Sequence, residues 1–239
     1  MTDLPERIAG IGALAEPVRR ELYLYVCAQG HAVSRDEAAE AIGVPLHKAK
    51  FHLDKLETEG LLKTEFARLS GKTGPGAGRP SKLYRRTSHD IAVSLPGREY
   101  ELAGRLMADA IDESATTGMP VIEALNRVAA ARGRDMGEVA LAKAGDRPGQ
   151  SMELACTVLA EHGYEPHEEG NQVLLANCPF HSLSATHTAM VCGMNLALID
   201  ALVGTIGDVE CHLDPAAERC CVVLQGAAVS LPGRRAPRG

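Results

Sequence analysis

The sequence predicts a mainly α-helical protein with small β elements, and three observations along its 239 residues support this fold class. Residues 1–90 combine helical patterns with two strand patterns that flank a Gly/Pro-rich loop, as in a winged helix-turn-helix domain. Residues 91–146 hold two alanine-rich amphipathic patterns, which predict a helical linker or dimerisation region. Residues 147–230 mix helix and strand patterns and hold most of the cysteines, which predicts a cysteine-rich α+β domain. The tail, 231–239, is predicted to be disordered.

The first two helices are marked by residues typical of helix ends. Apolar residues at helical spacing predict a helix over 17–29, with Pro17 suitably placed in its first turn. Ser34 and Glu37 form a capping-box pattern that opens a second, short helix. Gly43 is expected to end that helix.

A third helix and a hairpin complete the predicted domain. The helix is expected to run from Leu46 to Gly60, with an apolar stripe on one side and basic residues on the other. LLKTEFARL predicts a strand, SGKTGPGAGRPS a loop, and KLYRRT a returning strand. Together the two strands form the wing.

The charge distribution predicts contact with DNA, although the net charge of −6 alone argues against it. Between Lys63 and Arg86 there are seven basic residues and a single acid, Glu65. A local basic stripe is what binding to phosphates requires, whereas the simpler alternative is a solvated loop. The predicted DNA contacts lie on the third helix and on the wing: His47, Lys48, Lys50, His52, Lys72, Arg79, Lys82 and Arg85.

The composition predicts a cytoplasmic protein. The start, MTDLPERIAG, has no basic segment leading into an apolar run, and no stretch is expected to approach the length of a membrane span. In a reducing compartment, an odd number of cysteines favours metal, cluster or redox chemistry over disulfides. Cys27 and Cys156 are expected to be small buried hydrophobes.

Two helices are expected in 97–145, divided near Gly118, and they would bury one face against a second subunit or only cap the core of one subunit. GDRPGQS is the predicted linker. After it we expect a helix through CTVLAEHGY, a strand in NQVLLANCPF, a long helix in HTAMVCGMNLALIDALVGTIG and a last strand in RCCVVLQ.

The phrases LAEPVRRELYLYV, VPLHKAKFHLDKLETEGLL, GRPSKLYRRT and AVSLPGREYELAGRL resemble the winged-helix regulators of the ArsR-like superfamily, in an actinobacterial branch. With NCPFH, VCGMN and RCCV, the chain is similar over nearly its whole length to SufR-type regulators. The resemblance implies a homodimeric repressor that binds an operator in double-stranded DNA. It also implies an iron–sulfur cluster on the C-terminal cysteines and control of cluster-assembly genes.

The resemblance implies three ligands, Cys178, Cys192 and Cys220, which match the first, second and fourth cysteines of relatives. The position of the third falls near Ile206 and Gly207, which cannot bind a metal. The fourth ligand is therefore left open between His181, Cys211 and an exogenous group. Cys221 is expected to point away from Cys220, because successive side chains of a strand alternate between faces.

A four-iron cluster is favoured over a two-iron one, with zinc as the alternative cofactor. A thiol redox switch at Cys220 and Cys221 is a further alternative for the signal. An enzyme using Cys178 with His181 or His187 as base is a remote alternative, because no third orienting group is recognisable. The chain is thus expected not to be an enzyme, and neither a small-molecule substrate nor a membrane partner is expected.

Overall fold

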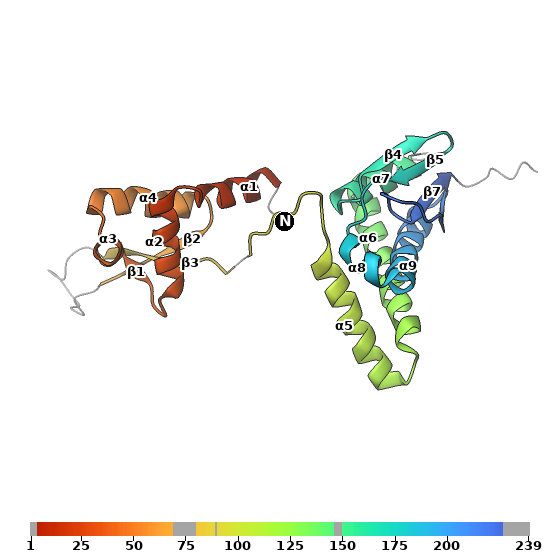
Figure 1. The fold of residues 1–239 in the computed structure, drawn as a ribbon, viewed down its shortest axis with the longest axis horizontal. Coiled ribbons are helices and arrows are strands. Elements are labelled where there is room, and N and C mark those ends of the chain that lie inside the picture. Colours follow the sequence, from red (N-terminus) through yellow and green to blue (C-terminus); the bar gives the residue numbers. More distant parts are fainter. Residues whose placement is uncertain (1–3, 69–79, 89, 146–149, 227–239) are drawn as a thin grey trace, which may run out of the picture. The chain divides into compact units, whose positions relative to one another are not determined.

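The computed structural model describes residues 4–68, 80–88, 90–145 and 150–226. The chain divides into two compact units, an N-terminal unit of residues 1–93 and a C-terminal unit of residues 94–239 (Figure 1). Each unit has its own hydrophobic core. The segments predicted as a linker at 145–151 and as a tail at 231–239 fall mostly or wholly outside the described residues.

The N-terminal unit is a winged helix. Its elements are α1 (Leu4–Ala13), α2 (Pro17–Ala28), β1 (Val33–Ser34), α3 (Arg35–Ile42), α4 (Leu46–Thr58), β2 (Leu62–Ala67) and β3 (Ser81–Arg86). The strands form one antiparallel sheet in the order β1-β3-β2, and β2 pairs with β3 from Leu62 opposite Arg86 to Ala67 opposite Ser81. The hairpin expected from the sequence is therefore present, and its tip lies outside the described residues.

The ends of α3 follow from the residues that mark them. The Ser34 hydroxyl accepts a hydrogen bond from the Glu37 N–H at 3.1 Å, while the Glu37 carboxylate accepts one from the Ser34 N–H. This confirms the capping box. Gly43 ends the helix with φ at 69°, a left-handed conformation that glycine adopts without a steric penalty.

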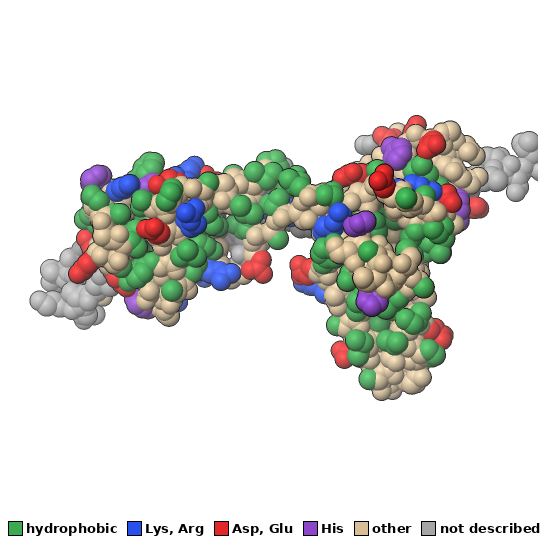
Figure 2. Space-filling model, viewed as in Figure 1, with side chains coloured by type: hydrophobic (Ala, Val, Ile, Leu, Met, Phe, Trp, Pro, Cys, Tyr) green, Lys and Arg blue, Asp and Glu red, His purple; other side chains and the backbone are tan. Residues whose placement is uncertain are grey.

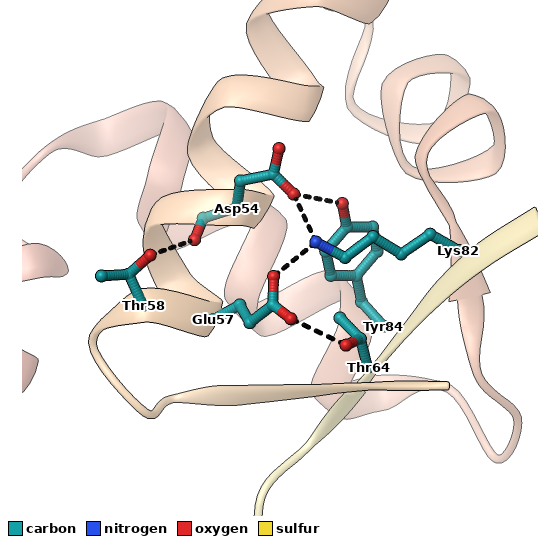
Figure 3. Close-up of polar contacts among 6 residues, drawn as sticks. All are labelled: Asp54, Glu57, Thr58, Thr64, Lys82 and Tyr84. Carbon is teal, nitrogen blue, oxygen red and sulfur yellow. Dashed lines mark hydrogen bonds and ion pairs between the residues drawn. The ribbon is translucent and has the colours of Figure 1, made fainter. Parts of the chain in front are cut away.

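One polar cluster ties α4 to the hairpin (Figure 3). The Lys82 ammonium of β3 donates to the Asp54 carboxylate of α4 at 2.8 Å and also binds Glu57. The buried Tyr84 donates its hydroxyl to the same Asp54 oxygen at 2.7 Å. Thr64 of β2 donates to Glu57. Both strands of the hairpin are thus fastened to the same side of α4.

The C-terminal unit packs helices against an antiparallel sheet of order β4-β5-β7-β6. Its elements are α5 (Tyr100–Thr117), α6 (Val121–Ala144), α7 (Ser151–Glu161), β4 (Pro166–Glu169), β5 (Gln172–Leu175), α8 (His181–Thr186), α9 (Thr188–Ile206), β6 (Val209–Leu213) and β7 (Val222–Gly226). The helices α5 and α6, which the sequence pattern places in a separate region, share the core of this unit.

Two glycines of α6 allow it to pack backbone to backbone on α9. A Cβ atom at Gly133 would lie 2.0 Å from the carbonyl oxygen of Leu198. At Gly137, a Cβ atom would lie 2.7 Å from Thr205. Any side chain at Gly133 would therefore force the two helices apart.

The expectation that no segment is long and apolar enough to cross a membrane was wrong. By length and composition α9 is such a helix, with 19 residues and a mean hydropathy of 1.8. Its apolar residues pack within the unit: Met194, Leu198, Ile199 and Leu202 are fully buried. In the described residues, 39% of the apolar window of α9 is buried against the rest of the structure.

Several short elements were not predicted. They are α1, β1, β4, α8 and β6. Each is at most ten residues long, and most have too few apolar positions to show a clear period in the sequence. Two of these elements carry a candidate fourth ligand, because α8 begins at His181 and β6 contains Cys211.

Candidate functional site

The exposed face of α4 carries most of the accessible residues predicted to contact DNA. His47, Lys48 and Lys50 are all exposed, as the helical spacing requires once Ala49, Leu53 and Leu56 are buried. α3 and α4 form the helix-turn-helix pair, in which the second helix is the one that enters the major groove. The basic side chains are thus displayed on the helix that would read DNA.

Phe51 on the same helix was not among the predicted contacts. Its ring is 63% exposed and lies next in sequence to Lys50. An exposed phenylalanine on a basic helix can contact the methyl group of thymine. Phe51 could have been found from the sequence, because it lies outside the apolar stripe that includes Leu53 and Leu56. A residue of this helix outside that stripe is expected to be exposed.

Other predicted contacts are placed differently. His52 is buried, and its ring lies 3.5 Å from the Arg19 Nε and 3.6 Å from Glu16, so it packs within the unit instead of facing solvent. Burial lowers the pKa of His52, and the attraction of Glu16 offsets only part of this. Lys82 is engaged by Asp54 and Glu57, which hold it against α4.

On the wing itself, Arg85 is half-buried and its guanidinium lies 3.9 Å from the Glu65 carboxylate across the hairpin. Lys72 and Arg79 lie outside the described residues. Of the predicted wing contacts that the structure describes, Arg85 is thus partly accessible and Lys82 has a structural role, while Lys63 and Arg86 of the same strands are exposed.

Four thiols from three segments converge in the C-terminal unit. Cys178 follows β5, Cys192 lies near the start of α9, and Cys220 with Cys221 directly precedes β7. The Cys178 thiol interacts with that of Cys220, Cys220 with Cys221, and Cys221 with Cys192. The structure thus brings together the three predicted ligands and adds Cys221.

The alternation expected at Cys220 and Cys221 does not apply to them, because the strand expected over RCCVVLQ begins only at its fourth residue, Val222. Cys220 and Cys221 lie before the strand, which starts at Val222. The alternation of side chains between faces holds only within a strand. In the segment before the strand, Cys220 and Cys221 can therefore both contact other members of the group of thiols.

An open cavity of about 450 Å³ adjoins these thiols. It is lined by Cys178, Cys192 and Cys221, by the His181 side chain, and by the two cations Arg98 and Arg219. The Glu218 carboxylate also lines the cavity, so cations and an anion lie beside the thiols. Once deprotonated, cysteines are the ligands that soft metals and iron–sulfur clusters prefer.

Two buried hydrogen bonds in series lead to the Cys220 sulfur. Tyr164 donates its hydroxyl to the Asn195 carbonyl oxygen at 2.6 Å, and the Asn195 amide nitrogen donates to the Cys220 sulfur at 3.2 Å. All three side chains are at most 1% exposed. A sulfur is a good acceptor as a thiolate and a weak one as a thiol, so this arrangement suits a ligand thiolate.

The surroundings of Cys178, Cys192 and Cys220 favour the protonated thiol by raising the pKa of each side chain. The neighbouring Cys220 and burial raise the pKa of Cys178 far above its ordinary value. The contact with Cys178 lowers the pKa of Cys220, but Cys221 and burial outweigh it and raise that pKa to about 11. Burial also raises the pKa of Cys192. A cation at the site would displace these protons.

The loop that carries Cys178 is fastened to the segment that opens the C-terminal unit. Asn177 is buried, and its amide nitrogen donates to the carbonyl oxygens of Gly97, at 2.9 Å, and Gly163. Arg98 donates to the Asn177 side chain and to the Cys178 carbonyl oxygen. The Glu99 N–H donates to the carbonyl oxygen of Pro179 at 3.2 Å. We call this set of contacts the loop clamp.

The remaining cysteines lie apart from the group. Cys211 on β6 donates to Asp200 at 3.8 Å, and burial together with this carboxylate raises its pKa to about 12. Cys156 is half-buried against the C-terminal core, and Cys27 is half-buried on α2. Within the described ranges, no group of three or more His, Cys, Asp or Glu side chains is placed so that it could hold a metal ion.

Comparison with known proteins identifies one domain. Residues 14–65 match the family described as a helix-turn-helix domain. This range runs from the end of α1 into β2 and includes both α3 and α4. No curated protein matches the chain. The match supports a DNA-binding transcriptional regulator.

Proposed function

We propose that the chain is a transcriptional repressor that binds operator DNA through α4 and the wing, and whose affinity for DNA is set by an iron–sulfur cluster held by Cys178, Cys192 and Cys220. The observation that carries the proposal is the convergence of buried thiols beside one cavity, in a chain that also has a helix-turn-helix domain. We propose that the protein acts in the cytoplasm as a homodimer and controls cluster-assembly genes.

The donor set supports a cluster over a structural zinc ion. Structural zinc sites take their cysteines in closely spaced pairs, whereas Cys178, Cys192 and Cys220 come from three separate segments. Thiolate ligands, donors to sulfur and nearby cations are the features that hold a cluster and set its potential. When bound, the cluster supplies a group that oxidants can alter or destroy.

The loop clamp supports coupling between the thiols and the DNA-binding unit. A change in the position of Cys178 acts on Asn177 and, through it, on residues 97–99. That segment follows closely after the end of the N-terminal unit at residue 93. Cluster binding would therefore favour one arrangement of this connection, which is the requirement for coupling two sites.

Exposed apolar residues on α5 and α6 support a dimer. Ile111, Ile122 and Val139 are all exposed, and Figure 2 shows hydrophobic side chains among the charged ones on this part of the surface. A homodimer would cover such residues and would present two reading helices to two half-sites.

The test is anaerobic purification followed by a visible spectrum and by iron and sulfide counts. We expect a brown protein whose colour is lost on Cys178→Ser, Cys192→Ser or Cys220→Ser and kept on Cys27→Ser, because Cys27 lies in the other unit. DNA fragments selected by the loaded protein should bind the loaded and empty forms with different affinities. A colourless protein with stoichiometric zinc would contradict the proposal.

A further inference from the structure

Cys221 is a fourth thiol at this site, and the resemblance that selects the other three gives it no role. We propose that Cys221 is the fourth thiolate ligand of the cluster, so that Cys220 and Cys221 bind as a tandem pair. The inference rests on the proposed function, because it concerns the ligand set of the same site.

The backbone holds the tandem pair in place from both sides. The Cys220 N–H donates to the carbonyl oxygen of Leu175 at 2.8 Å, at the end of β5. The Cys221 carbonyl oxygen accepts from the Asp214 N–H, also at 2.8 Å. Arg219, the residue before the pair, donates to Asp214 and to the Cys220 carbonyl oxygen. The turn is therefore fixed before any group binds.

The side chain of Cys221 links the group of thiols to the cavity. It interacts with the Cys192 thiol and with the Cys220 thiol, and it lines the cavity together with Cys178 and Cys192. The fully buried Cys220 is not part of that lining. A group bound in the cavity would therefore contact Cys221 at least as readily as Cys220.

The two rival ligands are placed less favourably. Cys211 points to Asp200 and not to the other thiols. His181 lines the same cavity but is exposed, whereas Cys221 is 8% exposed. Four thiolates are the usual ligand set of a four-iron cluster, and here a buried thiol that contacts Cys192 is available to complete it.

The local charge can support a fourth thiolate. Arg98 and Arg219 both line the cavity, and the guanidinium of Arg219 is largely buried. Cations beside a thiolate stabilise its charged form. Arg219 is paired with Asp214 and the Glu218 carboxylate also lines the cavity, so Arg98, which donates to neutral oxygens, is the cation that offsets part of the negative charge of a cluster.

The test compares Cys221→Ser with Cys211→Ser and His181→Ala in the full chain, after anaerobic reconstitution with ferrous iron and sulfide. We expect Cys221→Ser to lose one iron of four on mild oxidation and to give the electron paramagnetic resonance signal of a three-iron cluster. Cys211→Ser is the matched control for removing a thiol, and it should keep the iron content and spectrum of the unsubstituted protein.

The outcomes separate this inference from the proposed function. If the unsubstituted protein binds no iron and sulfide, the proposed function fails. If it binds a cluster that Cys221→Ser leaves unchanged while His181→Ala or Cys211→Ser loses an iron, the ligand assignment fails. If Cys221→Ser does not fold, as judged by circular dichroism, Mössbauer spectra of the unsubstituted protein decide. Four sulfur-ligated irons support Cys221, and one iron with a nitrogen or oxygen ligand overturns it.

Discussion

The side chain of Asn195 is buried, and both its amide oxygen and its amide nitrogen make hydrogen bonds. Its oxygen accepts from Tyr164 and its nitrogen donates to Cys220, so the tyrosine fixes which end of the amide faces the sulfur. A buried amide costs free energy unless both ends are bonded. The pair therefore orients one specific donor toward one specific sulfur.

Replacing this donor should change the potential of the cluster. We expect Asn195→Leu to lower the reduction potential, because a hydrogen bond to sulfur stabilises the more negative, reduced state. It should also cost about 1–3 kcal/mol of stability by leaving the Tyr164 hydroxyl without a partner. Tyr164→Phe keeps Asn195 but no longer fixes the orientation of its amide, so we expect it to lower the potential less than Asn195→Leu does. A redox titration in which both variants match the unsubstituted protein would contradict the role of Asn195.

Lys82 shows how a basic residue of a wing can be structural. We expect Lys82→Met to lower the stability of the N-terminal unit by about 1–2 kcal/mol, an amount reduced by partial exposure of the ion pairs. Chemical denaturation at neutral pH measures this change. Lys63→Met is the control, because Lys63 is exposed on the neighbouring strand. Equal stability of the two variants would contradict the structural role.

The same cluster predicts a pH dependence. Partial burial acts to raise the pKa of Asp54, but the hydrogen bonds from Lys82 and Tyr84 outweigh it and lower that pKa below its ordinary value. Glu57 shows the same balance, with Lys82 and Thr64 as the donors. The folded unit therefore gains stability above the unfolded pKa of about 4, and loses it as the pH falls through the lower folded pKa. Lys82→Met should show a smaller loss between neutral and acidic pH.

Among the elements, α6 and α9 depend on the absence of a side chain. We expect Gly133→Ala to destabilise the C-terminal unit by about 3 kcal/mol, because its Cβ atom would clash with the backbone of α9. Gly204→Ala is the matched control, since that helical position has no neighbour within 4 Å and should gain about 0.5–1 kcal/mol. Thermal unfolding of both variants checks the pair. A neutral Gly133→Ala would mean that the helices are more widely spaced.

The elements also show what could be predicted from sequence. The helices of the N-terminal unit carry caps and regular apolar spacing, and α2, α3 and α4 begin and end within a residue or two of their expected bounds. His52 and Lys82 could not be placed, because a basic residue looks the same in sequence whether a carboxylate of another element pairs with it or not. The direction of the Cys221 side chain could not be predicted, because it depends on the residue at which β7 begins. Strand ends are set by tertiary hydrogen bonds, such as that from the Cys220 N–H to the Leu175 carbonyl oxygen.

At the scale of the whole molecule, the exposed basic face of α4 predicts salt-dependent DNA binding. We expect Lys48→Ala to weaken binding and to reduce the slope of log affinity against log salt by about 1, because one phosphate contact is lost. Lys143→Ala removes an exposed lysine of the C-terminal unit and should leave the slope unchanged. Phe51→Ala should weaken binding without a change in slope, since an apolar contact releases no counterion. Fluorescence anisotropy over a salt series measures all three.

At the same scale, the two units should respond separately to denaturant. Each has its own core, and the Lys82 cluster and the α6–α9 contact lie in different units. Damage to one unit should thus leave the secondary structure of the other intact. The thiols, the loop clamp and the cavity all belong to the C-terminal unit, so the entire proposed sensing apparatus forms within one core.

The backbones of Gly97 and Gly163 touch, and a Cβ atom at Gly97 would lie 2.9 Å from the Cα atom of Gly163. The contact involves no sulfur and no cavity-lining side chain, so it does not depend on what the cavity binds. In the proposed mechanism, the residues that bind the metal therefore differ from those that join the Cys178 loop to the start of the unit. Substitutions among the thiols would change which group binds while leaving the close approach of Gly97 and Gly163 unchanged.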